Sequence, residues 1–377
     1  MPRFLEAVLL LSGMIIGVGM FAIPFSFVQT GFWPGIMELS VLACVVTALH
    51  LLYGEIVTAT PKFHRMPGYI RTYLGKEAAG VSWISTLFGT IGTLLAYLIV
   101  GSLFLQTILA RVVPNVNLGL LAAGLTCIVG LITFFPLRKE SAINGMLTLF
   151  EIAFITGLSL LLLPKVSFVS LGGMHLNNLF FPYGVLLFSL SGGSVIPDLV
   201  TILGRNKMRV RGAIVLGSLI PAVLYGLFAF AVVGVTGSAT STEAIAGLER
   251  VVGGNIAFWA SAAGFLAVLT SFIALSKNFQ ALLSLDMGLR SSLAWVSASI
   301  IPFALYLAGF RNFIAIIGIV GVVAFGVDGI LFLLMGRNVR RRQGNRSPVM
   351  ALVSYVILAV IVIGVVAELA RFLNGGV

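Results

Sequence analysis

Apolar runs of about 20 residues recur along the whole chain, and each is long enough for a helix to cross a lipid bilayer. Hydrophobic residues make up 59% of the sequence and charged residues 9%, whereas a typical soluble domain has about 25% charged residues. The runs do not alternate with a period of two, which argues against an outer-membrane barrel. The sequence therefore predicts an all-α, multi-pass membrane protein.

About eleven membrane spans are expected. They lie at residues 4–29, 33–59, 82–110, 118–136, 143–163, 178–202, 211–236, 255–277, 291–309, 312–336 and 349–373. The first run is longer than a signal peptide and has no clear small-residue cleavage site, so we expect it to be the first span rather than a leader.

Basic residues are distributed unevenly over the connecting segments. If the N-terminus is cytoplasmic, 18 of the 23 Lys and Arg residues, including the cluster at 337–346, lie on the cytoplasmic side. This positive-inside bias predicts an N-terminus inside and a C-terminus outside. The net charge of +11 is then a topology signal with possible contact to anionic lipid, and no nucleic-acid partner is expected. The predicted location is the cell (inner) membrane.

Two of the expected spans contain glycines and a proline near their centres. The first reads GMIIGVGMFAIPF at residues 13–25, and the second reads LFSLSGGSVIPDLV at residues 187–200. Pro24 and Pro197 each remove a backbone donor and clash with the preceding turn. Unwound backbone survives at bilayer depth only where it lines a wet cavity or binds something. Both stretches therefore predict broken helices with a function.

The two breaks lie 173 residues apart, and the same offset superposes the first five spans on the next five. Because five is odd, the second unit must enter the membrane from the opposite side. We expect a single transporter domain, residues 1–377, with inverted repeats at about 4–165 and 177–338 and an extra helix at 349–373. Inverted repeats with matching broken helices are typical of secondary transporters, whose substrate binds at the breaks.

Each broken span offers free N–H groups at one half-helix start and free C=O groups at another half-helix end. The N–H groups suit a carboxylate and the C=O groups suit a cation or an ammonium, so together they match an amino acid. Close helix packing is the alternative explanation for the glycines. The substrate-binding residues expected at the breaks are Gly17, Gly19, Met20, Phe21, Phe188, Ser191, Gly192 and Gly193.

Four stretches carry a resemblance to a known family. They are IIGVGMFAIPF followed by Gly31-Phe32, FSLSGGSVIPDLV, RNKMRVRGAIVLGSLIPAVLY at 205–225 and LAVLTSFIALSKNFQALLSLD at 266–286. In this order they resemble segments of the hydroxy/aromatic (tryptophan/tyrosine) amino acid permease family, within the amino acid/auxin permease group of the APC superfamily. The resemblance implies a LeuT-type 5+5 inverted-repeat fold with an eleventh helix. It also implies ion-driven uptake of amino acids such as tryptophan, tyrosine, serine or threonine. Residues 191–193 are smaller than the aromatic and histidine residues often found there, which leaves the side-chain preference open.

The resemblance also implies a cation site and a substrate-facing third helix. In this fold a cation binds between the first break and the eighth helix, and the third helix carries Tyr97 towards the substrate. The alternative for Tyr97 is ordinary packing, and the alternative for the two hydroxyls of the cation site is bonding to their own helical turn. The oxygens matching a Na⁺ site are the carbonyls of Gly13, Ile16 and Ala267 and the hydroxyls of Thr270 and Ser271.

Carboxyl groups at bilayer depth are costly and usually functional. The candidates are Glu55, Glu151, Asp198 and Asp328. Family members are often proton-driven, so the resemblance leaves H⁺ and Na⁺ open, with H⁺ favoured. Glu151 is the first choice for a proton carrier, because some proton-driven relatives of this fold place a charged side chain in its region. Glu55 is expected to carry a proton or to brace the unwound sixth helix, and Asp198 to cap a half-helix start.

Other classes of protein predict features that this sequence does not favour. A membrane enzyme needs clustered His, Cys or carboxylates, but His50, His64 and His175 form no metal or catalytic spacing, so no catalytic residue, metal or cofactor is expected. His50 is expected to be a hydrogen-bonded core residue. A channel predicts a continuous polar lining, and a non-transporting amino-acid sensor usually carries a long regulatory tail. The sequence leaves the oligomeric state open.

Overall fold

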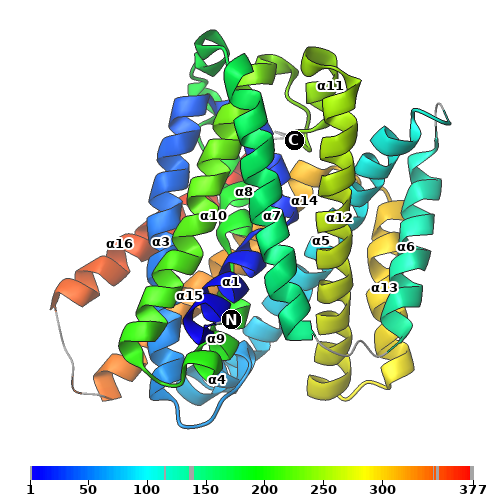
Figure 1. Ribbon diagram of the computed structural model, residues 1–377. Coiled ribbons are helices and arrows are strands. Elements are labelled where there is room, and N and C mark those ends of the chain that lie inside the picture. Colours follow the sequence, from blue (N-terminus) through cyan, green and yellow to red (C-terminus); the bar gives the residue numbers. More distant parts are fainter. Residues whose placement is uncertain (1, 114–115, 136–139, 343, 345–347, 374–377) are drawn as a thin grey trace.

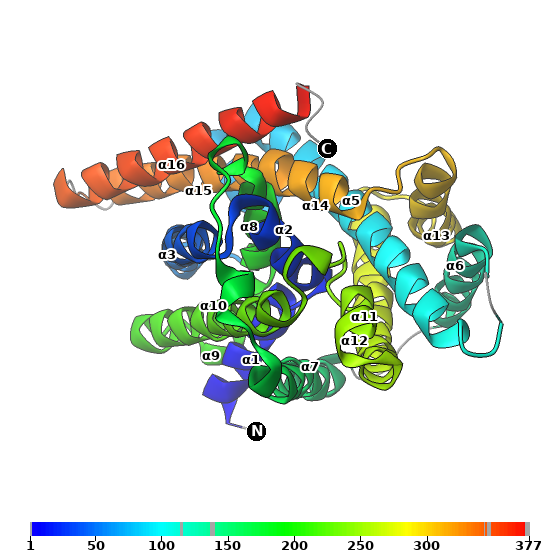
Figure 2. The same cartoon turned by 90° about the horizontal axis from the view of Figure 1, so that it is seen from above.

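The computed structural model describes residues 2–113, 116–135, 140–342, 344 and 348–373. Across these residues the chain is helical and contains no β-strand, which confirms the predicted all-α class. The helices pack side by side in a bundle, with α6 and α13 at one edge and α16 at the periphery (Figures 1 and 2).

The helices are given in chain order, and η marks a 3₁₀ or π segment. The first half contains α1 (Arg3–Ile15), η1 (Val18–Ala22), α2 (Ile23–Thr30), α3 (Phe32–Ala59), α4 (Met66–Leu74), α5 (Lys76–Leu109), α6 (Leu118–Phe134), α7 (Glu140–Leu162), η2 (Leu163–Lys165), η3 (Phe168–Leu171) and η4 (Leu176–Asn178). The second half contains α8 (Phe181–Leu190), η5 (Gly193–Val195), α9 (Ile196–Leu203), α10 (Lys207–Thr236), η6 (Gly237–Ala239), α11 (Ala246–Val252), α12 (Gly254–Ala281), η7 (Leu282–Asp286), α13 (Ser291–Leu307), α14 (Phe313–Val320), η8 (Gly321–Phe325), α15 (Gly326–Arg342) and α16 (Pro348–Leu373).

Each of the expected spans coincides with a helix or a broken helix. Within the described residues, eight helices are long and apolar enough to cross a membrane, and the bent pair α1 and η1–α2 makes a ninth. Two shorter apolar helices, α6 and α13, have 17 residues each. How many of them cross the membrane, and on which side the termini lie, stay predictions.

The same offset of 173 residues relates the helix boundaries in the first half of the chain to those in the second half. A shift of 173 residues carries Ile23–Thr30 onto Ile196–Leu203 and Leu118–Phe134 onto Ser291–Leu307. These agreements support two repeats, while the repeat boundaries and the inverted relation stay predictions.

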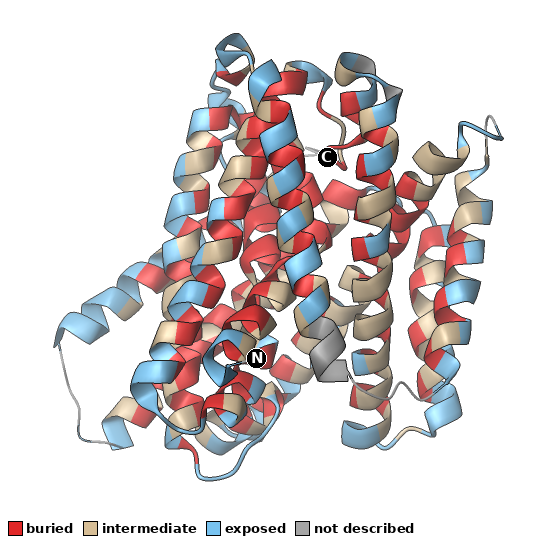
Figure 3. Cartoon of the chain, in the orientation of Figure 1, coloured by how far each residue is buried: buried red, intermediate tan, exposed pale blue. Residues whose placement is uncertain are grey.

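The centre of the bundle is formed by the two broken helices. The half-helix α1 packs against α7 and α10, and the half-helix α8 packs against α3, α14 and η8. Figure 3 shows that buried residues concentrate on these central helices, whereas exposed residues recur along the outer faces of α6 and α7, and α12 shows mainly residues of intermediate exposure. An exposed apolar face is expected of a helix that faces lipid.

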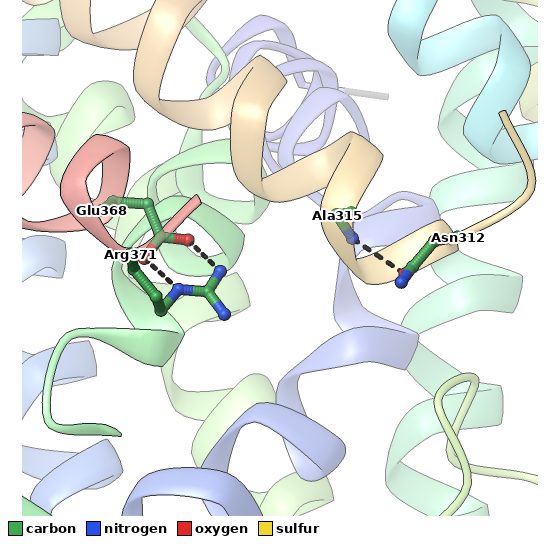
Figure 4. Close-up of polar contacts among 4 residues, drawn as sticks. All are labelled: Asn312, Ala315, Glu368 and Arg371. Carbon is green, nitrogen blue, oxygen red and sulfur yellow. Dashed lines mark hydrogen bonds and ion pairs between the residues drawn. The ribbon is translucent and has the colours of Figure 1, made fainter. Parts of the chain in front are cut away.

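The extra helix α16 lies along α15 (Figure 2). Near its C-terminal end, Arg371 donates to both carboxylate oxygens of Glu368, at 2.9 and 2.6 Å (Figure 4). The Glu368 side chain is fully buried, and the Arg371 guanidinium lies 4.2 Å from the centre of the Phe181 ring at the start of α8. The same view shows Asn312 capping α14, where its Oδ1 accepts from the Ala315 N–H at 3.1 Å.

The structure contains elements that the sequence did not predict. The short helices α4 and α11 connect α3 to α5 and α10 to α12, and the tenth expected span is interrupted by the π segment η8. A Cβ added to Gly321, the first residue of η8, would overlap the Gly184 carbonyl oxygen. The π segment therefore packs directly on α8, next to the contact between α14 and α8, and π segments often occur near functional sites.

Candidate functional site

The first break separates α1 from η1 and α2. Ile16 has ψ of 106°, and Gly17 is extended with φ −153° and ψ −159°. The two halves are bent by 48°. Pro24 lies in the first turn of α2, where the missing proline N–H would have no intrahelical partner in any case. The proline therefore starts the second half-helix instead of kinking a continuous one.

The second break has the same design. α8 ends at Leu190, Ser191 is extended with ψ of 125°, and Gly192 precedes the short η5. Pro197 lies in the first turn of α9. Both spans thus end one half-helix and start another close to the same place in the bundle.

The two breaks lie against each other. A Cβ on Gly19 would overlap Ser189 Oγ and lie 2.8 Å from the Phe188 ring, at the end of α8. A Cβ on Gly192 would lie 2.6 Å from Ile15 Cγ1, at the end of α1. Close packing, the alternative considered for the glycines, is therefore present, and it joins the breaks to one another.

Tyr225 of α10 connects the carbonyl ends of the two broken helices. Its hydroxyl lies 2.6 Å from the Ile15 carbonyl oxygen and 3.1 Å from that of Ser189, and its single proton is shared between these two acceptors. These are carbonyls that regular helix continuation would have satisfied. One side chain thus replaces lost backbone bonds in both spans.

His50 of α3 supports the second break from the other side. The Gly192 N–H donates to His50 Nε2 at 3.2 Å, and His50 Nδ1 lies 3.1 Å from Ser218 Oγ. Because a backbone N–H only donates, Nε2 must be unprotonated, and in the neutral ring Nδ1 carries the proton and donates to Ser218. The prediction that His50 is a hydrogen-bonded core residue is confirmed, since its side chain is 2% exposed.

A cavity of about 520 Å³ lies beside both breaks. It extends to the exposed segment between α3 and α4, where Arg65 forms an ion pair with Asp286 at 2.8 Å. Three carboxyl groups line it, those of Glu151, Asp198 and Asp328. This volume is within the range of small-molecule sites.

The structure distributes the expected substrate-binding residues between two cavities. Met20 and Phe21 line a second, much smaller cavity of about 10 Å³ instead of the large one, which is close to the space that one water molecule needs. Phe21 is 1% exposed and packs edge-on against Phe104, with ring centres 4.9 Å apart. The residues that line the large cavity are Gly17, Gly19, Tyr97, Phe188, Ser191, Gly192 and Gly193.

The five expected cation ligands line these cavities, but their hydroxyls already have partners. Thr270 Oγ1 lies 3.0 Å from the carbonyls of Leu266 and Ala267 in its own helix, which is the alternative considered above. Ser271 Oγ donates to Glu151 Oε1 at 3.2 Å. Ile16, Ala267 and Ser271 border the small cavity, and Gly13, Thr270 and Ser271 border the large one.

Glu151 lies at this cation region. Its side chain is 6% exposed and lines both cavities. Tyr97 lies across the small cavity, and a Cβ on Gly17 would be 2.8 Å from its hydroxyl. The structure therefore brings a carboxyl group, a tyrosine and the first break together.

Two of the predicted roles do not agree with the structure. Glu55 forms no bond to the second break within the described residues: its carboxylate lies 3.5 Å from Arg340, its side chain is 38% exposed, and His50 accepts the Gly192 N–H. Asp198 lies in the first turn of α9 and forms no capping hydrogen bond within the described residues, although a negative charge there is favoured by the helix dipole.

The chain is similar to proteins of a known family. The model of the tryptophan/tyrosine permease family matches residues 1–371. A relative named Glutamine transporter 2, from Aliivibrio fischeri (strain ATCC 700601 / ES114), is 22% identical over 350 residues, which cover 90% of each chain.

Solved structures resemble the whole chain. A manganese transporter of Eremococcus coleocola, solved with an aromatic bis-isothiourea compound, is 14% identical and has a TM-score of 0.68, covering 98% of this chain and 87% of its own. MhsT in complex with L-phenylalanine is 16% identical and has a TM-score of 0.65, covering 98% of each chain. At such identities the likeness establishes the fold alone, and it confirms the predicted LeuT-type transporter fold.

Proposed function

Because the chain belongs to the tryptophan/tyrosine permease family, we propose that it imports an amino acid together with a proton. Family and fold make it a multi-pass membrane transporter and not an enzyme. We propose three properties beyond the family and the fold: the direction of transport, the coupling ion and the substrate.

One observation supports an amino acid substrate above the others. The two breaks touch one another and border a single cavity. Half-helix starts offer unpaired N–H groups to a carboxylate, and half-helix ends offer carbonyls to an ammonium. A substrate with both groups close together, such as an α-amino acid, uses both kinds of end at once.

The position of Glu151 supports a proton as the coupling ion. The carboxyl group occupies the region where the fold would place Na⁺, and it takes the Ser271 hydroxyl as a partner. Thr270 is bonded to its own helix. A titratable group at bilayer depth is a natural proton carrier. A Na⁺-coupled transporter remains the second candidate, because Ile16, Ala267 and Ser271 still border one small cavity.

The family and the cavity wall support a proposal for the substrate class. Phe188 and Phe325 pack edge-on with ring centres 5.9 Å apart, and both line the cavity. We propose an aromatic or hydroxy amino acid, such as tryptophan, tyrosine, serine or threonine. The name of the Aliivibrio fischeri relative places glutamine in the panel to be tested.

Uptake by proteoliposomes tests the proposal. Purified protein is reconstituted, a panel of labelled amino acids is offered, and H⁺ and Na⁺ gradients are imposed separately. Accumulation against a gradient under an inward H⁺ gradient is expected. Facilitated flux without accumulation would favour a channel, binding without flux would favour a sensor, and either result would contradict the proposal.

Glu151→Gln tests the coupling step. Glutamine retains an acceptor for Ser271 but cannot take up a proton, so we expect at least about a tenfold loss of H⁺-driven accumulation. Exchange of external for internal substrate, which needs no net proton movement, should persist. Glu55→Gln is the matched control, because Glu55 pairs with Arg340 away from both cavities. Unchanged accumulation in Glu151→Gln would contradict the assignment.

A further inference from the structure

A second carboxyl–serine pair also lines the large cavity. Ser85 Oγ of α5 lies 2.9 Å from Asp328 Oδ1 of α15 and 3.0 Å from the Ala324 carbonyl oxygen of η8. Both Ser85 and Asp328 line the cavity, as do Glu151 and Ser271. The mechanism proposed above makes no use of Asp328.

The two pairs occupy corresponding helices of the two repeats. Glu151 lies on the fifth helix of the first repeat and bonds to Ser271 on the third helix of the second. Asp328 lies on the fifth helix of the second repeat and bonds to Ser85 on the third helix of the first. The offset of 173 carries Glu151 onto Ala324, whose carbonyl also faces Ser85 and which lies one helical turn before Asp328.

The hydrogen bonds around Ser85 depend on the protonation state of Asp328. A serine hydroxyl has one proton to donate, yet Ser85 faces two acceptors, Asp328 Oδ1 and the Ala324 carbonyl. An ionised Asp328 takes that proton and leaves Ala324 without it. A protonated Asp328 donates to Ser85, and Ser85 then donates to Ala324. Only protonated Asp328 forms the complete hydrogen-bond chain from its carboxyl group through the Ser85 hydroxyl to the Ala324 carbonyl.

The surroundings of Asp328 leave this carboxyl open to the cavity. On the side of α16, Gly326 and Gly329 face the apolar Val365 and Ile361. From α3, Tyr53 interacts electrostatically with Asp328, and from α4, the Tyr73 backbone carbonyl accepts from the Asn338 side chain further along α15. The other titratable or charged side chains that line the cavity are His50, His64, Arg65, Glu151 and Asp198, besides Tyr97.

We infer that Asp328 and Ser85 form a second proton-binding site, the counterpart in the second repeat of Glu151 and Ser271. The ligand is a proton that reaches Asp328 through water in the cavity. This inference rests on the proposed function, since it assigns two protons to each transported amino acid. Asp328 binds one and Glu151 binds the other.

The proton-to-substrate ratio tests the inference. It is measured in proteoliposomes as the reversal condition, the combination of pH gradient and membrane potential at which a fixed substrate gradient produces no net flux. Two protons per substrate are expected for the wild type and for Glu55→Gln. One is expected for Asp328→Asn, and Asp328→Glu should restore two.

Infrared difference spectra provide a readout that does not depend on transport. Raising the pH of the purified protein should remove a carboxylic acid C=O band that Asp328→Asn lacks and that Ser85→Ala shifts, because Ser85 is the hydrogen-bond partner. If Asp328→Asn does not fold, the spectra of Asp328→Glu and Ser85→Ala decide.

Each other outcome has a distinct meaning. A wild-type ratio of one that Asp328→Asn leaves unchanged overturns the second site and leaves the proposed function intact. A Na⁺-driven component that is lost in Asp328→Asn overturns the proton assignment in favour of Na⁺. No H⁺-driven accumulation by the wild type, with a normal Asp328 band, contradicts the proposed function instead.

Discussion

At the scale of single residues, His50 determines how the second break is held. Its ring accepts the Gly192 N–H and donates to Ser218, an arrangement that needs the neutral ring. His50→Phe should leave the Gly192 N–H buried without a partner, at a cost of about 1–3 kcal/mol. If the substitution destabilises the substrate-bound state by this amount, the affinity for substrate drops about 5- to 150-fold.

His50→Gln is the informative comparison, because the glutamine carbonyl can reach the position of Nε2 and accept the same N–H. We expect it to bind substrate within a few-fold of the wild type. Binding is measured by titration calorimetry, with size-exclusion profiles to monitor folding. Equal affinities in His50→Phe and the wild type would contradict this role.

Tyr225→Phe tests the link between the two breaks. The substitution removes only the hydroxyl that donates to Ile15 and Ser189, so two carbonyls lose a shared donor. We expect a midpoint of thermal unfolding several degrees lower and weaker substrate binding. Tyr355→Phe on α16, whose side chain is 57% exposed, is the matched control and should change neither.

These two residues show where residue-level prediction ended. The Gly–Pro pattern identified both breaks, because proline and glycine act locally on the chain. The groups that satisfy the breaks come from α3 and α10, and the Gly192–His50 bond joins residues 142 positions apart. No local signal distinguishes Glu55 from His50 as the partner of the break, and bracing by Glu55 was the expectation. The only available signal was a polar residue within an apolar span, and Glu55 and His50 both have that property.

At the scale of elements, glycines set how closely the helices approach. Gly321 of η8 lies against the Gly184 carbonyl of α8, so Gly321→Ala should force the two elements apart. Overpacking of this kind costs about 1–3 kcal/mol. The unfolding midpoint of the detergent-purified protein should fall.

Gly124→Ala is the control for Gly321→Ala. Gly124 also lies within a helix, α6, but an added Cβ meets nothing within 4 Å. Alanine has the higher helix propensity, so Gly124→Ala should leave the midpoint unchanged or raise it. Equal midpoints for the two variants would contradict the close contact between η8 and α8.

Spans were more predictable than the interruptions within them. The length of each apolar run was enough to predict a helix there. The offset of 173 matches the first and last residues of α2 to those of α9, and those of α6 to those of α13. The sequence did not predict the π segment η8, and the helix that it packs against, α8, lies more than 100 residues earlier in the chain. The run GIVGVVAFGVDG contains no proline, so nothing local predicts a break there.

At the scale of the whole molecule, the large cavity reaches one end of the helices and aromatic packing closes the other. The exposed residues Arg65 and Ser194 line it. On the far side of the first break, Phe21 packs against Phe104 of α5 and Phe228 of α10, with ring centres 4.9 and 6.3 Å apart. If the N-terminus is cytoplasmic, as the basic residues predict, the cavity opens inward.

Cysteine labelling tests both the membrane topology and the side of the membrane to which the cavity opens. Cys44 and Cys127, both free and exposed, are first replaced by alanine, and Ser194→Cys is then introduced in the cavity. A membrane-impermeant maleimide should label it in inverted vesicles and not in right-side-out vesicles, and substrate should slow the reaction. Val169 lies in the segment between α7 and α8 and is 90% exposed, so Val169→Cys should label only in right-side-out vesicles. Reversal of both patterns would invert the predicted topology. Labelling of both positions from outside would mean that the cavity opens to the exterior.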